Sequence, residues 1–226
     1  MKLKPAAVAI SLLFGVSAAS AIVVQDIGPA TVTYDEKTTL ASLSSWSSVG
    51  SNYSFAWTIP NTAAVVSFGA LATTLVNLPS FTLTPNIGWT LSGEVTASLG
   101  NLFFVEVGGA TTNITAIASA SIDGGPVITT SGVTAKTPTL LPPGALLGYF
   151  SDSRTLPIGA FNSLAVSNAS LTLSASGGTF SSITANPQNK LEISFTAMPV
   201  PEPETYAMLL SGIAVIGWVA KRRRSI

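Results

Sequence analysis

Polar and apolar residues alternate with a period of two through most of the chain between residues 22 and 198. The segment 52–59 carries Tyr, Phe, Trp and Ile at every second position, and segments 89–99, 114–122 and 190–196 repeat the pattern. Such alternation is typical of β-strands with one buried face. No amphipathic helix of convincing length interrupts the alternation, so the sequence predicts about nine to twelve strands.

Turn residues divide these strands. Gly100-Asn101 separates segment 89–99 from the apolar segment 102–107, and this spacing predicts a tight hairpin. Because segment 102–107 is apolar on both faces, we expect it to be a central strand of its sheet. Asp123-Gly124-Gly125-Pro126 ends the strand that begins at Ile114.

The strand spacing predicts an all-β fold, a single antiparallel β-sandwich or jelly-roll-like domain over residues 22–198. The proline-containing stretch 134–144 is compatible with a domain boundary or with a long loop inside one domain. We favour the loop.

The first 21 residues have the pattern of a secretory signal peptide. Lys2 and Lys4 form a positive start, an apolar stretch of about eleven residues follows, and Ala19-Ser20-Ala21 is a cleavage motif for signal peptidase. The alternative is an uncleaved anchor, but the apolar stretch is short for a membrane span. We therefore expect recognition of Ala19 and Ala21, cleavage after Ala21, and export by Sec-type machinery.

The other end of the chain carries an apolar stretch and a cluster of cations. Residues 206–220 are apolar or small apart from Ser211, and Lys221, Arg222, Arg223 and Arg224 follow. As a helix, the fifteen apolar residues would cover about 22 Å, short of a hydrocarbon core of roughly 30 Å. We nevertheless expect a transmembrane helix over residues 205–220, with flanking residues extending its reach and the cations as a cytoplasmic stop-transfer signal. The alternative is a buried core helix, which would normally have a polar face.

A proline-acid box precedes this helix. Pro201, Glu202 and Pro203 lie within the sequence PVPEPE at residues 199–204. Prolines at alternate positions favour an extended, exposed segment, which suits a processing site or a spacer.

The order of these features, Pro-Glu-Pro box, apolar helix and terminal arginine cluster, resembles the PEP-CTERM sorting signal. The resemblance covers residues 199–226. It implies an exported protein of a Gram-negative bacterium, recognised by an exosortase-like membrane protease, often in an exopolysaccharide or biofilm context. It also implies transient anchoring in the inner membrane with the body on the periplasmic side, followed by release to the cell surface or the extracellular space.

The amino-acid composition limits which ligands residues 22–197 can bind and which reactions the chain can catalyse. These residues hold four cations against eight acids, a net charge of −4, so nucleic acid has no basic surface to bind. The chain has no cysteine and no histidine. Their absence excludes thiolate chemistry and removes the commonest general base. We therefore expect no enzymatic activity, no cofactor and no metal site.

Two groups of side chains, acids and aromatics, are candidates for a catalytic or binding site. In the predicted hairpin, Glu94 and Glu106 point to opposite faces and cannot flank one glycosidic bond. Asp123 fits a turn, and Asp152 could pair with Arg154 or take part in a calcium site, although the sequence holds no D-x-D-x-D-G loop. The aromatic residues Trp46, Tyr53, Trp57, Trp89 and Tyr149 could form a sugar-stacking platform, although alternating aromatics more often belong to a core.

The resulting hypothesis is a non-enzymatic exported protein with a structural or adhesive role, and polysaccharide is a further candidate partner. The alternatives are a secreted carbohydrate-binding module and a permanently anchored envelope protein.

Overall fold

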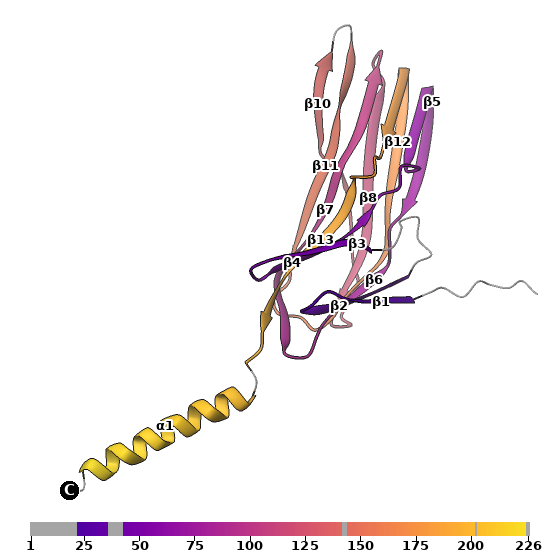
Figure 1. Ribbon diagram of the computed structural model, residues 1–226. Helices are drawn as coiled ribbons and strands as arrows, with labels where there is room; N and C mark the ends of the chain where they lie inside the picture. Colours follow the sequence, from indigo (N-terminus) through magenta and orange to yellow (C-terminus); the bar gives the residue numbers. More distant parts are fainter. Residues whose placement is uncertain (1–21, 36–42, 142–143, 202, 225–226) are drawn as a thin grey trace, which may run out of the picture.

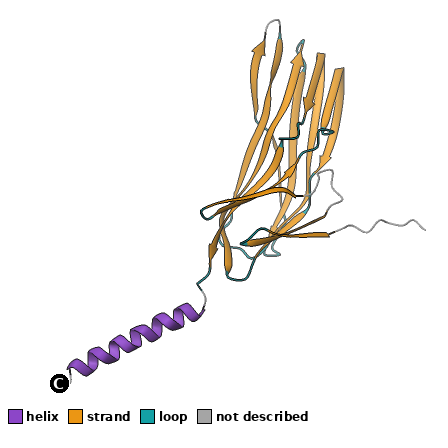
Figure 2. Ribbon diagram, viewed as in Figure 1, coloured by secondary structure: helices purple, strands orange, loops and turns teal. Residues whose placement is uncertain are grey.

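A computed structural model describes residues 22–35, 43–141, 144–201 and 203–224. Within these ranges, thirteen strands form one antiparallel sheet, and a single helix follows them (Figure 1, Figure 2). The elements are β1 (Ile22–Asp26), β2 (Ala30–Asp35), β3 (Leu43–Val49), β4 (Asn52–Thr58), β5 (Ala64–Asn77), β6 (Phe81–Pro85), β7 (Trp89–Val107), β8 (Thr111–Ile122), β9 (Ile128–Val133), β10 (Lys136–Leu141), β11 (Ala145–Pro157), β12 (Leu164–Thr184), β13 (Lys190–Pro199) and α1 (Pro203–Arg224).

The sheet is curled into a half-barrel. Hydrogen-bonded neighbours follow the order β1-β2-β6-β12-β7-β13-β4-β3, with β11 and β10 beside β7, β8 and β9 beside β12, and β5 along β12. The prediction of an all-β antiparallel fold is confirmed.

A sandwich would have two separate sheets. This protein has one continuous sheet, because β12 pairs with β8 in one section and with β7 in another. Residues 164–176 of β12 pair with β8, whereas residues 180–184 pair with β7. Gly177 and Gly178 lie between these two sections with positive φ angles of 71° and 59°. This left-handed conformation favours glycine, and it allows the strand to bend and change its partner.

The predicted hairpin at Gly100-Asn101 is wrong, because β7 runs through these residues as one strand. Leu99 pairs with Asp152 and Leu102 with Phe150, so β11 follows β7 on both sides of the glycine with one shift of register. Gly100 and Asn101 also lack the positive φ that a two-residue hairpin turn requires. The central position predicted for segment 102–107 is confirmed, since it lies between β11 and β12.

The core lies on the inner face of the curl and contains the side chains that alternation predicts. Phe55 and Trp57 on β4, Ile193 and Phe195 on β13, and Ile114 on β8 are buried. Phe55 packs edge-on against Trp57 and Phe81, with ring centroids 5.3 and 5.5 Å apart. Full burial of each such side chain stabilises the fold by roughly 1.5–3 kcal/mol.

The stretch 134–144 is part of the sheet as far as it is described. Within it, β10 pairs with β11 from Lys136↔Phe150 to Leu141↔Ala145. The turn predicted at residues 123–126 is present between β8 and β9.

Helix α1 extends beyond the predicted bounds of 205–220 at both ends. Among the described residues, no helix combines the length and the apolarity needed to cross a membrane. The prediction of a transmembrane helix over residues 205–220 is not confirmed. The uncharged stretch 206–220 would cover about 22 Å, and Glu204 and four cations lie in the rest of the helix. The signal-peptide prediction, with Ala19 and Ala21, lies outside the described residues.

Candidate functional site: the C-terminal processing segment

The sheet ends at the start of the proline-acid box. Pro199 is the last residue of β13 and pairs with Trp89 on β7. The next residue, Val200, donates its backbone N–H to the carbonyl oxygen of Gly88 at 2.8 Å. Pro201 is exposed and belongs to no strand or helix, and α1 begins at Pro203. The box is thus the covalent connection between the sheet and the helix.

Proline chemistry explains why the change of structure occurs here. Pro201 has no N–H to extend the ladder of β13. Pro203 occupies the first position of α1, where a missing N–H costs nothing and a fixed φ fits the helix. Glu204 follows in the first turn, where its charge complements the helix dipole. An extended segment over all of residues 199–204 was expected, but its ends belong to β13 and α1.

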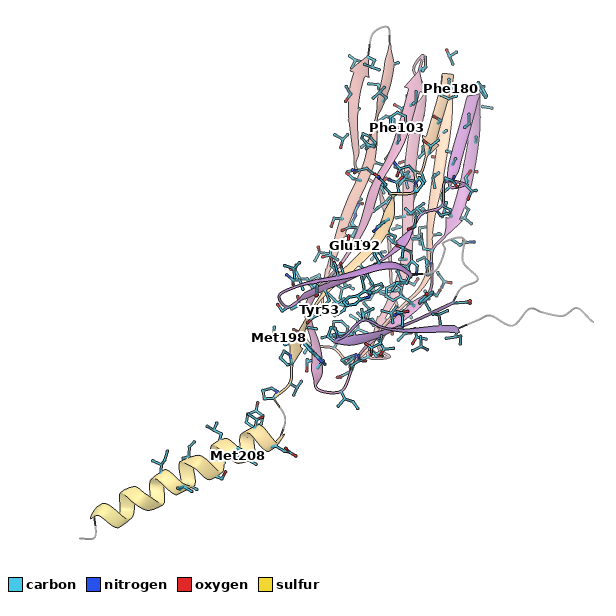
Figure 3. All side chains as sticks on the ribbon, viewed as in Figure 1. Tyr53, Phe103, Phe180, Glu192, Met198 and Met208 are labelled. Carbon is cyan, nitrogen blue, oxygen red and sulfur yellow. The ribbon has the colours of Figure 1, made fainter. Side chains whose placement is uncertain are left out.

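Helix α1 extends away from the sheet (Figure 1). Every side chain described from Glu204 to Ile216 is exposed. Met208, labelled in Figure 3, is 75% exposed, and Leu210 and Ile216 are exposed to a similar degree. The hydroxyl of Ser211 donates to the carbonyl oxygen of Ala207 at 2.7 Å, so this polar group needs no outside partner. Apolar surface left open in this way marks a site of contact with protein or lipid.

The basic cluster falls in the last turn of the helix. The backbone of residues 221–224 is helical, and cations at a helix C-terminus are stabilised by the helix dipole. The stop-transfer role of Lys221, Arg222, Arg223 and Arg224 stays a prediction.

In the sheet, the two glutamates of β7 lie far apart. Glu94 is exposed on the outer face, while Glu106 is buried on the inner face. Twelve residues of one strand separate them by about 40 Å. The expectation that they cannot flank one bond is confirmed, although the reason is a single long strand and not a hairpin.

Glu106 belongs to a buried polar cluster that sequence reasoning missed. Lys136 of β10 donates from Nζ to Glu106 Oε1 at 2.5 Å and to the carbonyl oxygen of Thr112 at 3.1 Å. Thr112 of β8 donates to the same Oε1 from its backbone N–H and, at 2.8 Å, from its hydroxyl. Lys136 Nζ also lies over the Phe104 ring, 4.7 Å from its centroid. No local sequence pattern predicts this cluster, because its members come from three different strands.

The other two candidate acids, Asp123 and Asp152, have local structural roles. Asp123 Oδ1 accepts the backbone N–H groups of Asn162 and Ser163 at 2.8 and 2.7 Å, which ties two loops together. Arg154 Nε donates to Asp152 Oδ2 at 2.8 Å, as predicted.

The five candidate aromatics do not form one platform. Trp57 is buried, and Tyr53 and Trp89 pack together at 6.1 Å between ring centroids. Trp46 and Tyr149 are 56% and 47% exposed. However, Trp46 pairs with the inward-facing Phe55 on one edge of the sheet, whereas Tyr149 pairs with Phe103 on the outer face. The sugar-stacking platform is therefore not assembled.

The chain was compared with known families and proteins. No curated protein matches it, and no solved structure matches it. Residues 199–224 match the family described as the PEP-CTERM protein-sorting motif. This match begins at the last residue of β13 and ends at the last residue of α1, and it includes Pro201, Glu202 and Pro203. The segment that follows the β-sheet therefore carries a PEP-CTERM protein-sorting motif.

Proposed function

We propose that this chain is an exported, non-enzymatic surface protein whose C-terminal segment is recognised and cut by an exosortase-type membrane protease. One observation carries the proposal: among the described residues, the connection that carries the sorting motif makes no hydrogen bond to the sheet beyond Val200, and it leads into a helix that is exposed from Glu204 to Ile216. A protease can reach such a segment without unfolding the sheet.

The intact mass of the protein recovered outside the cell tests this proposal. We expect a mature chain that begins near Ile22 and ends close to Pro201. Replacing both box prolines (Pro201→Ala with Pro203→Ala) should leave a cell-associated form that still carries Trp218 and the arginine cluster. The matched control is Pro187→Ala, in an exposed turn of the sheet. A surface form that retains the tail in the unaltered protein would overturn the proposal.

For the mature body we propose a structural or adhesive role in an extracellular matrix. Its support is the hydroxyl-rich lower part of the outer face, where Thr96 and Thr155 lie 3.0 Å apart and Ser98 and Ser153 3.2 Å apart, measured between side-chain oxygens. Hydroxyl groups of this kind exchange hydrogen bonds with polysaccharide. Co-sedimentation of the mature protein with extracellular polysaccharide tests the role, and recovery entirely in the soluble fraction would contradict it.

A further inference from the structure

The turn between β6 and β7 lies beside the start of the processing segment. The ladder between β13 and β7 ends where Val200 donates its backbone N–H to the carbonyl oxygen of Gly88 at 2.8 Å. The same antiparallel register, continued by one residue, brings Ile87 level with Pro201. The proline-acid box therefore leaves the sheet at the tip of this turn.

Hydrogen bonding and glycine fix the shape of the turn. The backbone N–H of Trp89 donates to the carbonyl oxygen of Asn86 at 3.0 Å, and Gly88 between them has a φ of 81°. A positive φ at this position is that of a type II turn, which glycine adopts without strain. Ile87 is thus the first of the two central residues, at the tip of the turn.

The side chain of Asn86 fastens this turn to the neighbouring turn between β1 and β2. Its Nδ2 donates to Oδ1 of Asp26 at 3.0 Å and to the carbonyl oxygen of Gly28 at 2.8 Å. Its Oδ1 accepts the hydroxyl of Thr31 at 2.6 Å, and its backbone N–H donates to the carbonyl oxygen of Pro29 at 2.9 Å. These bonds hold the tip of the β6–β7 turn in one position relative to the sheet.

The tip presents apolar side chains to solvent. Ile87 is 104% exposed, the largest exposed fraction among the large apolar side chains of the described residues. Met198 and Val200, at the adjoining end of the sheet, are 52% and 45% exposed, and Figure 3 places Met198 between Tyr53 and α1. An apolar side chain held in place in this way loses little conformational entropy when a partner covers it.

We infer that the β6–β7 turn positions the processing segment for cleavage, and that Ile87 is an apolar contact for the protease that cuts the proline-acid box. This role rests on the proposed function. The partner follows from the sorting motif, because Val200 belongs to the matched residues 199–224 and is bonded directly to the turn. A protease cleft that holds Pro201 meets Ile87 at the same time.

The rate at which cells convert the full chain to the mature chain tests this role, followed by pulse labelling and intact mass. We expect Ile87→Ser to slow conversion about tenfold, as loss of a strong interface contact does, and Ile87→Val to stay within about twofold of the unaltered chain. The matched control is Leu140→Ser, which should also stay within about twofold. Leu140 is 73% exposed on β10, at the end of the sheet farthest from α1 (Figure 1). Equal rates for Ile87→Ser and the unaltered chain would overturn the inference. An unaltered chain that is never cut would instead overturn the proposed function, and the role of the turn with it.

Two further measurements separate a contact with the protease from an effect on the fold. Thermal unfolding of the purified full chain in mild detergent should be the same for Ile87→Ser and the unaltered chain, because the side chain is fully exposed. A lower melting temperature for Ile87→Ser would assign the slow conversion to the fold and overturn the inference.

An insertion tests the position of the box directly. Two alanines placed between Val200 and Pro201 move the box by about 7 Å from the turn. We expect this insertion to slow conversion as much as Ile87→Ser does, and the combination to be no slower than either change alone. Normal conversion of the inserted chain, or slowing that adds to that of Ile87→Ser, would contradict the role of the turn.

Discussion

Glu106 and Lys136 are charged side chains that the fold holds beside its core. Only 4% of the Glu106 side chain is exposed, while Lys136 is 29% exposed and lies over two aromatic rings. A buried carboxylate is tolerated when its hydrogen bonds are satisfied, and here three donors reach Oε1. The cluster links β7, β8 and β10, so it holds separate parts of the curled sheet together.

Removing only one partner of this cluster should therefore be costly. We expect Glu106→Ala to lower the free energy of unfolding by about 3 kcal/mol, because it removes the counter-ion of Lys136 and leaves the two donors of Thr112 without their acceptor. Glu94→Ala, on the exposed part of the same strand, should change it by less than about 0.5 kcal/mol. Urea unfolding followed by circular dichroism measures both values.

A double variant separates the ion pair from simple loss of packing. Glu106→Leu combined with Lys136→Met removes both charges and should be less destabilising than Glu106→Ala. If the double variant is less stable than both Glu106→Ala and Glu94→Ala, the charges themselves contribute net stability and our account of the cluster is wrong.

At the scale of elements, the alternation of residue types predicted where strands lie but not which strands pair. Segment 52–59 is a strand because its pattern is local. Gly100-Asn101, by contrast, is compatible with a turn and with a continuous strand, and only pairing with the distant β11 decides between them. The Glu106 cluster was missed for the same reason. The sorting segment was recognised because all of its signals are contiguous in sequence.

The continuous sheet depends on the bend in β12, and Gly178 makes this bend possible. A Cβ atom at this position would meet the backbone N of Ala110 and the carbonyl oxygen of Val107, in the turn between β7 and β8. We expect Gly178→Ala to cost at least about 2 kcal/mol, from the positive φ and this close approach together. Thermal unfolding measures the effect.

Gly109 provides the matched control for this prediction. It also has a positive φ, 79°, but no atom lies within 4 Å of a Cβ placed there. Gly109→Ala should cost only the conformational term, about 1 kcal/mol. Equal destabilisation by the two variants would mean that the close approach at β12 does not constrain the bend.

At the scale of the whole molecule, the protein has two parts, the β-sheet and helix α1, and the sheet does not depend on the helix for its core. The sheet encloses its own core, and Val200 makes the last hydrogen bond to the sheet among the residues described before α1. The helix is exposed from Glu204 to Ile216. Removal of the tail by a protease should therefore leave the sheet intact, as the proposed processing requires.

This separation gives a direct prediction for a chain that ends at Pro201. Its free energy of unfolding should lie within about 0.5 kcal/mol of that of the full chain, because no described side chain from Glu204 to Ile216 is buried against the sheet. The comparison is made by urea unfolding in the same mild detergent. A chain that ends at Thr196 is the control, since it also loses the pairs that Ala197, Met198 and Pro199 make with β7, and with them the buried side chain of Ala197. It should be less stable by more than about 1 kcal/mol. Equal losses from both truncations would show that α1 stabilises the sheet, and processing would then weaken the mature protein.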